Sequence, residues 1–229
     1  MKPPKPMALT LRALARLLSY PDVELRAHLD ELRQALRHEA ALQPARLAEV
    51  EALIDSLAAQ SDIDAEADYV QLFDSGRRTS LHLFEHVHGD SRDRGPAMID
   101  LAQSYELAGL YLAEGEMPDH LPVVLEYAST QPPREAAAFL AEMAHIFGVI
   151  FSALDKRGSR YASLLGGLVE LAGEKCAPVQ VADEEPIDDS WAEPAAFDGC
   201  SVAGQSRPGQ AQPIQIQRKT GGTAAGARP

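Results

Sequence analysis

Apolar residues recur at spacings of three and four along the first 175 residues of this 229-residue chain. The spacing is most regular at Leu140, Met143, Phe147, Ile150 and Leu154. Such a pattern places the apolar side chains on one face of a helix, and that face must be buried against other helices. Sustained alternation with period two is absent from the sequence, so no sheet is expected. The sequence therefore predicts an all-α fold, a single bundle of about eight or nine helices.

Proline and glycine punctuate the helical pattern. The expected boundaries lie at Pro21-Asp22, Gln43-Pro44, Gly89, Gly115 to Pro118, Pro132-Pro133 and Gly158-Ser159. After Cys176 the apolar pattern ends, and Gly, Pro, Ser, Gln and acidic residues dominate. Such a composition buries too little apolar surface to offset a backbone ordering entropy of roughly 1–2 kcal/mol per residue. We therefore predict a helical domain over residues 1–176 and a mostly disordered acidic tail over residues 177–229, in which Trp191 and Phe197 are either a small docking patch or isolated aromatics.

Charge and hydropathy exclude several classes of protein. The formal net charge of −13 argues against a nucleic-acid partner, because an acidic protein repels the phosphate backbone. Uncharged apolar runs are far shorter than the ~18–20 residues needed to cross a bilayer. Arg12 and Arg16 interrupt the first apolar run, which is typical of an amphipathic helix rather than a secretory signal. We therefore expect a cytoplasmic protein that does not insert into the membrane, with Cys176 and Cys200 as free thiols.

Ionisable residues are concentrated between Glu85 and Arg94, where two histidines, three acids and two arginines fall within ten residues. Gly89 is expected to end one helix in the left-handed conformation. Asp90, Ser91 or Asp93 is expected to cap the next helix, with Pro96 in its first turn. A second polar cluster, Glu116–Pro122, is expected to begin a helix at Pro118-Asp119, with His120 in its first turn. These structural roles explain why some of the acidic residues are present, but they explain the arginines and histidines less well. The unexplained charged residues indicate a binding surface.

The segment His82-Leu-Phe-Glu85-His86 matches the H-x-x-E-H pattern of zinc peptidases. On a helix the two imidazoles would share one face, with the carboxylate between them. A zinc hydrolase would also need a third protein ligand and a water-filled cleft, and the alternative is a pair of surface or network histidines. The sequence contains no P-loop, dinucleotide-binding glycine motif or nucleophile elbow. Catalysis therefore has little support, and no catalytic or metal-binding residue is assigned.

Three motifs together resemble one family. They are Tyr69-x-x-Leu-Phe-Asp74, then Phe84-Glu-His-Val-His-Gly-Asp-Ser-Arg-Asp-Arg-Gly95 with Ala97-Met98, and Glu116-x-Pro-Asp-His-Leu-Pro122 ahead of Leu125-Glu126. The family is the delta subunit of respiratory nitrate reductase, the molybdenum-cofactor assembly chaperone of the membrane-bound enzyme. It belongs to a wider group of all-helical chaperones for molybdenum reductases. The resemblance covers residues 7–175, with Pro96 and Met117 standing where the family is expected to have Gln and Leu.

The resemblance implies a non-catalytic role and no cofactor of the protein's own. A chaperone of this kind binds the N-terminal segment of the catalytic alpha subunit while that subunit lacks its cofactor, and transiently binds the alpha–beta complex. It assists insertion of the molybdenum cofactor before the enzyme docks at the membrane. The alternatives are a chaperone of the same fold for another molybdenum reductase, a generic helical adaptor, and the zinc hydrolase that uses His82, Glu85 and His86.

An amphipathic peptide would lie in a groove between helices, with its apolar face inward. The residues expected to form that groove are Tyr69, Phe73, Phe84, Glu85, His86, His88, Asp90, Arg92, Arg94, Met98, Tyr105, Asp119 and His120. The aromatic residues and Met98 would form its floor, although core packing is the alternative for Phe73 and Phe84. Glu85, Asp90 and Asp119 would meet basic groups at the rim. Truncating Tyr69 and Glu85 to alanine is then expected to weaken peptide binding with little loss of thermal stability.

Overall fold

The computed structural model describes residues 5–89 and 91–177, and that part of the chain is built from helices without any strand. Its ten helices are α1 (Ala8–Leu17), α2 (Val23–Ala27), α3 (Leu29–Glu39), α4 (Pro44–Ala59), α5 (Asp62–Phe73), α6 (Leu83–Val87), α7 (Arg94–Leu107), α8 (Leu121–Thr130), α9 (Pro133–Lys156) and α10 (Ala162–Leu171). The all-α prediction is therefore confirmed. The described helices outnumber the expected eight or nine because α2 and α6 have only five residues each, too few for a 3.6-residue period to reveal.

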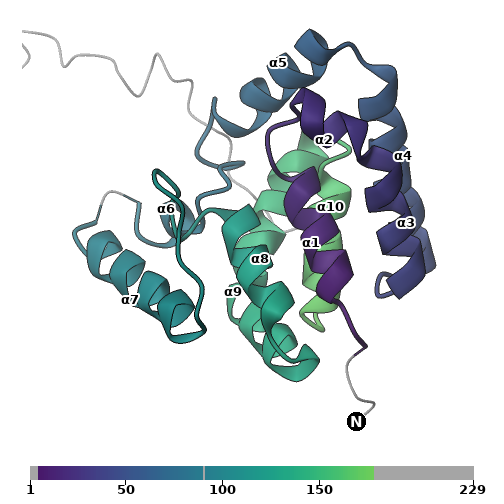
Figure 1. Ribbon diagram of the computed structural model, residues 1–229. Helices are drawn as coiled ribbons and strands as arrows, with labels where there is room; N and C mark the ends of the chain where they lie inside the picture. Colours follow the sequence, from purple (N-terminus) through teal and green to yellow (C-terminus); the bar gives the residue numbers. More distant parts are fainter. Residues whose placement is uncertain (1–4, 90, 178–229) are drawn as a thin grey trace, which may run out of the picture. The chain divides into compact units, whose positions relative to one another are not determined.

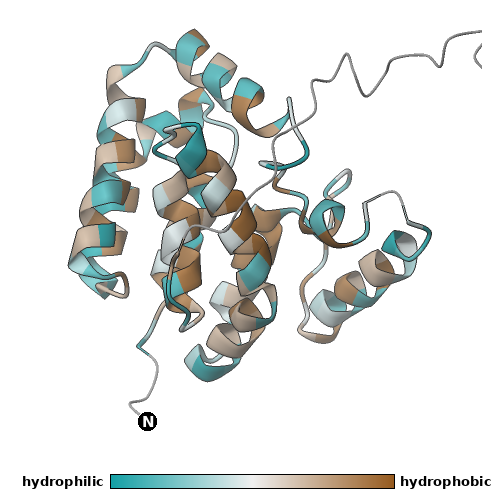
Figure 2. Cartoon of the chain, turned by 180° about the vertical axis from the view of Figure 1, so that it is seen from behind, coloured by the Kyte–Doolittle hydropathy of each residue, from teal (hydrophilic) through white to brown (hydrophobic). Residues whose placement is uncertain are grey.

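Six of the helices pack in an order that closes on itself. α9 contacts α8 and α10, α1 contacts α8 and α3, and α4 contacts α3 and α10; Figure 1 shows these helices gathered together. Leu14 of α1, Leu125 of α8 and Phe147 of α9 are fully buried between them. Hydrophobic residues gather on the sides where these helices face one another (Figure 2), and α10 is buried on nearly every side. The predicted apolar faces therefore form one shared core, and α7 lies beside it.

α9, with 24 residues, is the longest described helix of this core. Among the described helices, it alone is long and apolar enough, by length and composition, to cross a bilayer. The sequence expectation missed this because Glu142 interrupts the uncharged run, whereas a membrane span tolerates an occasional charge. Half of the apolar stretch is buried inside the fold, where it packs against α8 and α10. Its hydropathy is explained by burial in the protein core.

The helix boundaries follow most of the predicted signals. Asp22 caps α2 by accepting a hydrogen bond from the Leu25 backbone N–H at 2.7 Å. Gly89, which follows α6, has φ +51°, the left-handed conformation that favours glycine. Two boundaries were misplaced. α7 ends at Leu107, before the expected boundary at Gly115 to Pro118, and α8 begins at Leu121 with His120 as its N-cap residue. The helix cannot begin earlier because residues 119–121 pair with residues 81–83 in an extended bridge.

The described chain ends shortly after α10. Cys176 is a partly buried free thiol that packs against the core. Trp191, Phe197 and Cys200 lie outside the described residues. The domain boundary at residue 176 and the disordered tail over residues 177–229 therefore stay predictions.

Candidate functional site

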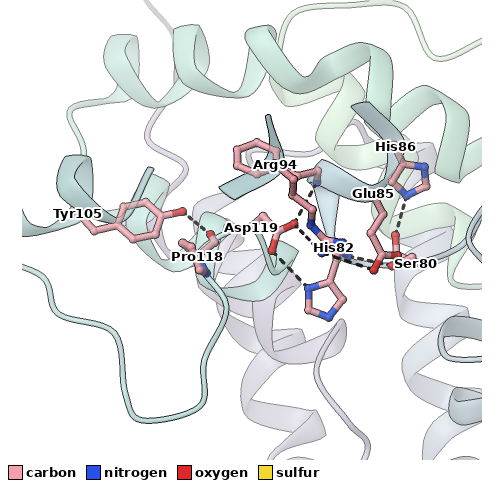
Figure 3. A network of polar contacts seen from close by, with 9 residues as sticks. Ser80, His82, Glu85, His86, Arg94, Tyr105, Pro118 and Asp119 are labelled. Atoms are coloured by element: carbon pink, nitrogen blue, oxygen red, sulfur yellow. Dashed lines mark hydrogen bonds and ion pairs between the residues drawn. The ribbon is translucent and has the colours of Figure 1, made fainter. Parts of the chain in front are cut away.

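The two polar clusters of the sequence meet where α6 and α8 begin. An antiparallel bridge joins His82 to His120, and Leu83 N donates to the Asp119 carbonyl oxygen at 3.0 Å. The two imidazole rings stack with their centroids 5.1 Å apart. The bridge brings the residues around His82 next to those around Asp119 (Figure 3). We call this arrangement of residues 80–85, Arg94 and residues 118–121 the α6–α8 junction.

Asp119 lies at the centre of the junction and is fully buried. Its Oδ2 accepts a hydrogen bond from Phe84 N at 3.1 Å, and its Oδ1 lies 3.4 Å from His82 Nδ1. Arg94 Nη2 lies 3.8 Å from Asp119 Oδ2 and 3.5 Å from Glu85 Oε1 (Figure 3). A buried carboxylate requires partners of this kind because its ionised form is costly to remove from water. Asp119 therefore ties together the first turns of α6 and α7 and the start of α8, rather than standing at an exposed rim.

The contacts shift the pKa values of three groups in the junction. Burial alone would raise the pKa of Asp119, but the hydrogen bonds from His82 and Phe84 and the charges of His82 and Arg94 together lower it. The hydrogen bond to Asp119 raises the pKa of His82, against the opposing effect of burial. Burial, together with the charge of His82, lowers the pKa of His120. The pKa values of the two stacked histidines are therefore shifted in opposite directions.

An NMR titration of the imidazole protons is expected to show His82 protonating above, and His120 below, the ordinary histidine pKa of about 6.5. His82 binds its proton more tightly in the fold than in the unfolded chain. Its contribution to stability is therefore complete below that ordinary pKa and is lost as the pH rises through its raised folded-state pKa. In an Asp119→Asn variant the His82 midpoint should fall, and an unchanged midpoint would show that Asp119 is not the cause of the shift.

Further hydrogen bonds attach neighbouring groups to the junction. His86 Nε2 lies 2.9 Å from the Ser80 carbonyl oxygen. Tyr105 is the one buried residue of α7, and its hydroxyl donates to the Pro118 carbonyl oxygen at 2.8 Å (Figure 3). α7 is thus held at its first residue, Arg94, and again at Tyr105. The other residues of this helix are exposed or half-buried.

The H-x-x-E-H segment does not form a helical histidine pair. His82 precedes α6 with extended backbone (φ −85°, ψ 102°), because the bridge to His120 holds it there. Its Nδ1 faces Asp119, whereas His86 Nε2 faces the Ser80 carbonyl oxygen. Within residues 5–89 and 91–177, no group of three or more His, Cys, Asp or Glu side chains is placed to hold a metal ion. The structure therefore does not place both imidazoles on one helical face, the arrangement that the zinc-hydrolase alternative would need.

Tyr69 and Phe73 lie in the core and not at the α6–α8 junction. Their side chains are 7% and 5% exposed, and the Tyr69 hydroxyl donates to the Leu18 carbonyl oxygen at 2.7 Å. The Phe73 ring packs edge-on against Tyr161, with centroids 5.1 Å apart. For Phe73 this is the core packing that the sequence left as the alternative. The ring and hydroxyl of Tyr69 are likewise occupied by the fold.

The remaining predicted site residues have mixed exposure. Phe84, Glu85, His86, His88, Arg94, Met98 and His120 are half-buried, Arg92 is exposed, and Asp90 lies outside the described residues. The structure brings Phe84, Glu85, Arg94, Asp119 and His120 together, and His86 directly follows Glu85 in α6. Peptide binding by any of them stays a prediction. The carbonyl acceptors of Ser80 and Pro118 were not anticipated, because backbone acceptors carry no sequence signal of their own. The contact of His82 with Asp119 is the network role that the sequence left as the alternative for this histidine.

A half-open cavity of about 410 Å³ lies beside Tyr105, among α1, the end of α7, the loop after it and α8. It is lined by Arg12, Arg16, Tyr105, Leu110, Tyr111, Leu112, Glu116, Val123, Glu126, Tyr127, Ser129 and Thr130. Of these residues, only Tyr105 was assigned to the predicted groove, although Glu116 belongs to the second polar cluster of the sequence. The apolar stripe of α1 predicts a buried face but not the helix it packs against. The hydrogen bond from Arg12 Nε to Ser129 Oγ, at 3.1 Å, joins residues 117 positions apart.

Comparison with known proteins extends over most of the chain. The model of the nitrate reductase delta subunit family matches residues 20–165, which include all three motifs and the α6–α8 junction. The chain is 42% identical over 188 residues to the nitrate reductase molybdenum cofactor assembly chaperone NarJ of Escherichia coli (strain K12), covering 81% of this chain and 78% of that protein.

Two further relatives are more distant. Identity is 33% over 160 residues to the probable nitrate reductase molybdenum cofactor assembly chaperone NarJ of Bacillus subtilis (strain 168), covering 69% of this chain and 84% of the relative. The chain is 30% identical over 138 residues to the chlorate reductase assembly chaperone protein of Ideonella dechloratans, covering 59% of this chain and 61% of that protein. The extent of the family match, together with the 42% identity to the Escherichia coli protein, decides the assignment. This chain belongs to the nitrate reductase delta subunit family.

Proposed function

We propose that this chain is a dedicated assembly chaperone of nitrate reductase. It binds the N-terminal segment of the catalytic alpha subunit before that subunit has its molybdenum cofactor, and it assists insertion of the cofactor before the enzyme docks at the membrane. The observation that carries the proposal is the 42% identity, over 81% of this chain, to a protein named as such a chaperone. The protein performs no bond chemistry and works in the cytoplasm, on the alpha subunit alone or transiently on the alpha–beta complex.

The surface around α7 suits a peptide partner. Ile99 is 59% exposed and Leu107 is 90% exposed, so α7 offers apolar side chains that the fold does not cover. Half-buried Met98 lies on the same helix, and half-buried Phe84 lies on the neighbouring α6. Exposed apolar groups beside a cavity support docking of an amphipathic segment. The acidic character of the chain, with a net charge of −13, favours a basic partner through long-range attraction.

Calorimetric titration of the purified chain with a synthetic peptide of the alpha subunit's N-terminal segment tests the proposal. We expect saturable binding of one peptide per chain, with a negative heat-capacity change from burial of apolar surface. A peptide of the same composition in scrambled order is the control. Equal binding of the scrambled peptide would contradict specific recognition of the client.

A second client class is favoured by one comparison. A relative that is 30% identical over 138 residues is named as an assembly chaperone of chlorate reductase, so members similar to this chain serve more than one enzyme. The same titration with N-terminal peptides of other molybdenum reductases from the same organism separates the two cases. Nitrate reductase is the client if its peptide binds most tightly, and another reductase is the client if its peptide does.

A further inference from the structure

α5 carries two apolar stripes, and the fold covers only one of them. The first stripe, Ala65, Tyr69 and Phe73, has spacings of four residues and is buried in the core. The second includes Ile63 and Val70, which lie two turns apart on another face of the helix. These two side chains are 78% and 41% exposed. A helix at the surface of a globular domain needs one apolar stripe to fold, so folding does not explain the second stripe.

A shallow groove follows the second stripe. Its lining includes Ile63, Ala67 and Val70 of α5 together with Tyr20 of the connection between α1 and α2. The Tyr20 ring is 44% exposed and packs edge-on against buried Tyr69, with centroids 5.6 Å apart, which fixes the ring in place. Because Ala67 is small, the surface between its two larger neighbours is hollowed. We call the surface formed by the four lining residues named above the α5 groove.

The charges along the α5 groove are negative. α5 contains no lysine, arginine or histidine, but it contains four acidic residues, Asp62, Asp64, Glu66 and Asp68. At about 3.6 residues per turn, Glu66 flanks the second stripe on one side, and Asp64 and Asp68 flank it on the other. Arg26 of α2 is already engaged, since its Nε lies 2.8 Å from Asp62 Oδ1 and both of its Nη atoms donate to backbone carbonyl oxygens.

The hydroxyl of Tyr20 is surrounded by the same negative charge. Burial raises its pKa, and a hydrogen bond with Glu66 and the charges of Glu66, Asp22 and Asp74 raise the pKa further. These carboxylates come from α5 itself, from the N-cap of α2 and from the C-cap of α5. The two arginines that follow α5 in the sequence are not among the residues that line the groove. The surroundings of the apolar stripe therefore favour a cationic partner.

We propose that the α5 groove is a docking site for a basic amphipathic helix of a second partner protein, distinct from the client segment. An aliphatic side chain of that helix packs against Ala67, between Ile63 and Val70, and flanking lysines or arginines meet the carboxylates of α5. A second copy of this chain does not fit, because a two-fold interface would place acidic residues against acidic residues. Both views of the molecule show α5 well apart from α7 (Figures 1 and 2), so the inference does not rest on the proposed function.

Two synthetic helical peptides test the proposal. They share one leucine stripe, and their other positions carry lysines in one peptide and glutamates in the second. Backbone amide signals of the isotopically labelled full chain are followed during each titration. We expect the lysine peptide to shift the signals of α5 and Tyr20 saturably, with weaker binding as the salt concentration rises, and the glutamate peptide to leave them unchanged. Shifts spread over the whole acidic surface, or confined to α7, would overturn the assignment.

Removing apolar surface without changing charge separates docking from general attraction. Val70→Ser alters the α5 groove, and Leu9→Ser alters α1 at a residue of matching exposure, 41% against 40%. We expect Val70→Ser to weaken the lysine peptide by about tenfold and Leu9→Ser to leave its affinity unchanged. Equal affinities would overturn the assignment. Circular dichroism and thermal melting show whether each variant is folded, and Ala67→Trp, which fills the groove, decides if Val70→Ser is not.

Charge reversal gives an independent comparison. Glu66→Lys changes the net charge as much as Glu142→Lys does, and Glu142 is an exposed residue of α9 that does not line the groove. We expect only Glu66→Lys to weaken the lysine peptide strongly and to reduce the salt dependence of its binding. Equal losses in the two variants would show that net charge, and not the α5 groove, governs the affinity.

Competition separates this inference from the proposed function. We expect the N-terminal peptide of the alpha subunit not to displace the lysine peptide from the α5 groove. If it does displace the lysine peptide, the groove belongs to the client segment, and the assignment to a second partner is overturned while the proposed function stands. If the alpha-subunit peptide binds nowhere on the chain but the lysine peptide binds at α5, the proposed function fails and the docking site stands.

Discussion

Replacing Tyr69 by alanine is expected to destabilise the protein by about 3–5 kcal/mol, the usual cost of truncating a buried aromatic residue. The ring is 7% exposed and packs against Phe73 with centroids 4.8 Å apart. The hydroxyl also loses its hydrogen bond to the Leu18 carbonyl oxygen. Urea denaturation with a common m value measures the change in the free energy of unfolding. The structure thus reverses the sequence expectation that this truncation leaves stability nearly intact.

Two control variants separate the contributions of the Tyr69 hydroxyl and ring to the loss of stability. Tyr69→Phe removes only the hydroxyl, so it should cost about 1 kcal/mol. Val70→Ala changes the neighbouring residue, which is 41% exposed, and should cost much less than the truncation of Tyr69. If Tyr69→Ala lost peptide binding but unfolded at the same urea concentration as the unaltered chain, Tyr69 would belong to the groove floor and not to the core.

Replacing Asp119 by alanine is expected to lower the free energy of unfolding by about 2–3 kcal/mol, because hydrogen bonds to a charged group are lost and buried partners are left without an acceptor. The Phe84 N–H loses its acceptor at 3.1 Å, and Arg94 and His82 lose the carboxylate they face. The partial exposure of Arg94 and His82 keeps the cost below that of a fully buried ion pair. Urea denaturation again gives the size of the loss.

Hydrogen exchange locates the effect of the Asp119 substitution. The Phe84 amide should exchange much faster in Asp119→Ala, since opening of the α6–α8 junction no longer breaks a bond to a buried carboxylate. Glu114→Ala, at an exposed residue of the nearby loop, is the matched control and should leave both stability and exchange unchanged. Equal stability of the two variants would mean that Asp119 does not hold the junction together.

The helical scaffold was predictable because its signals are local. The stripe from Leu140 to Leu154 predicts α9, and Asp22, Pro44 and Pro133 mark helix starts that the structure reproduces. One-turn helices such as α6 escape this reasoning, since five residues cannot show a period. Side-chain period identifies which face of a helix is buried, but not which helix covers it.

The candidate site was only partly predictable for the same reason. The polar residues around Glu85 and Asp119 were recognised as two clusters, and the structure joins them across a separation of 37 residues. Their roles depend on partners that periodicity does not reveal: Asp119 is buried where an exposed rim was expected, and Tyr69 points into the core. The cavity between α1 and α8 escaped notice because its walls come from segments more than a hundred residues apart.

We propose above all that this chain recognises an unfinished nitrate reductase. The most direct test of this proposal is co-purification of the chain from nitrate-respiring cells in which molybdenum-cofactor synthesis is blocked, compared with cells that make the cofactor. We expect the alpha subunit to be recovered with the chain from the blocked cells, and we expect the finished enzyme not to be recovered with it. Recovery of equal amounts of cofactor-loaded enzyme, or of no alpha subunit in either case, would contradict it.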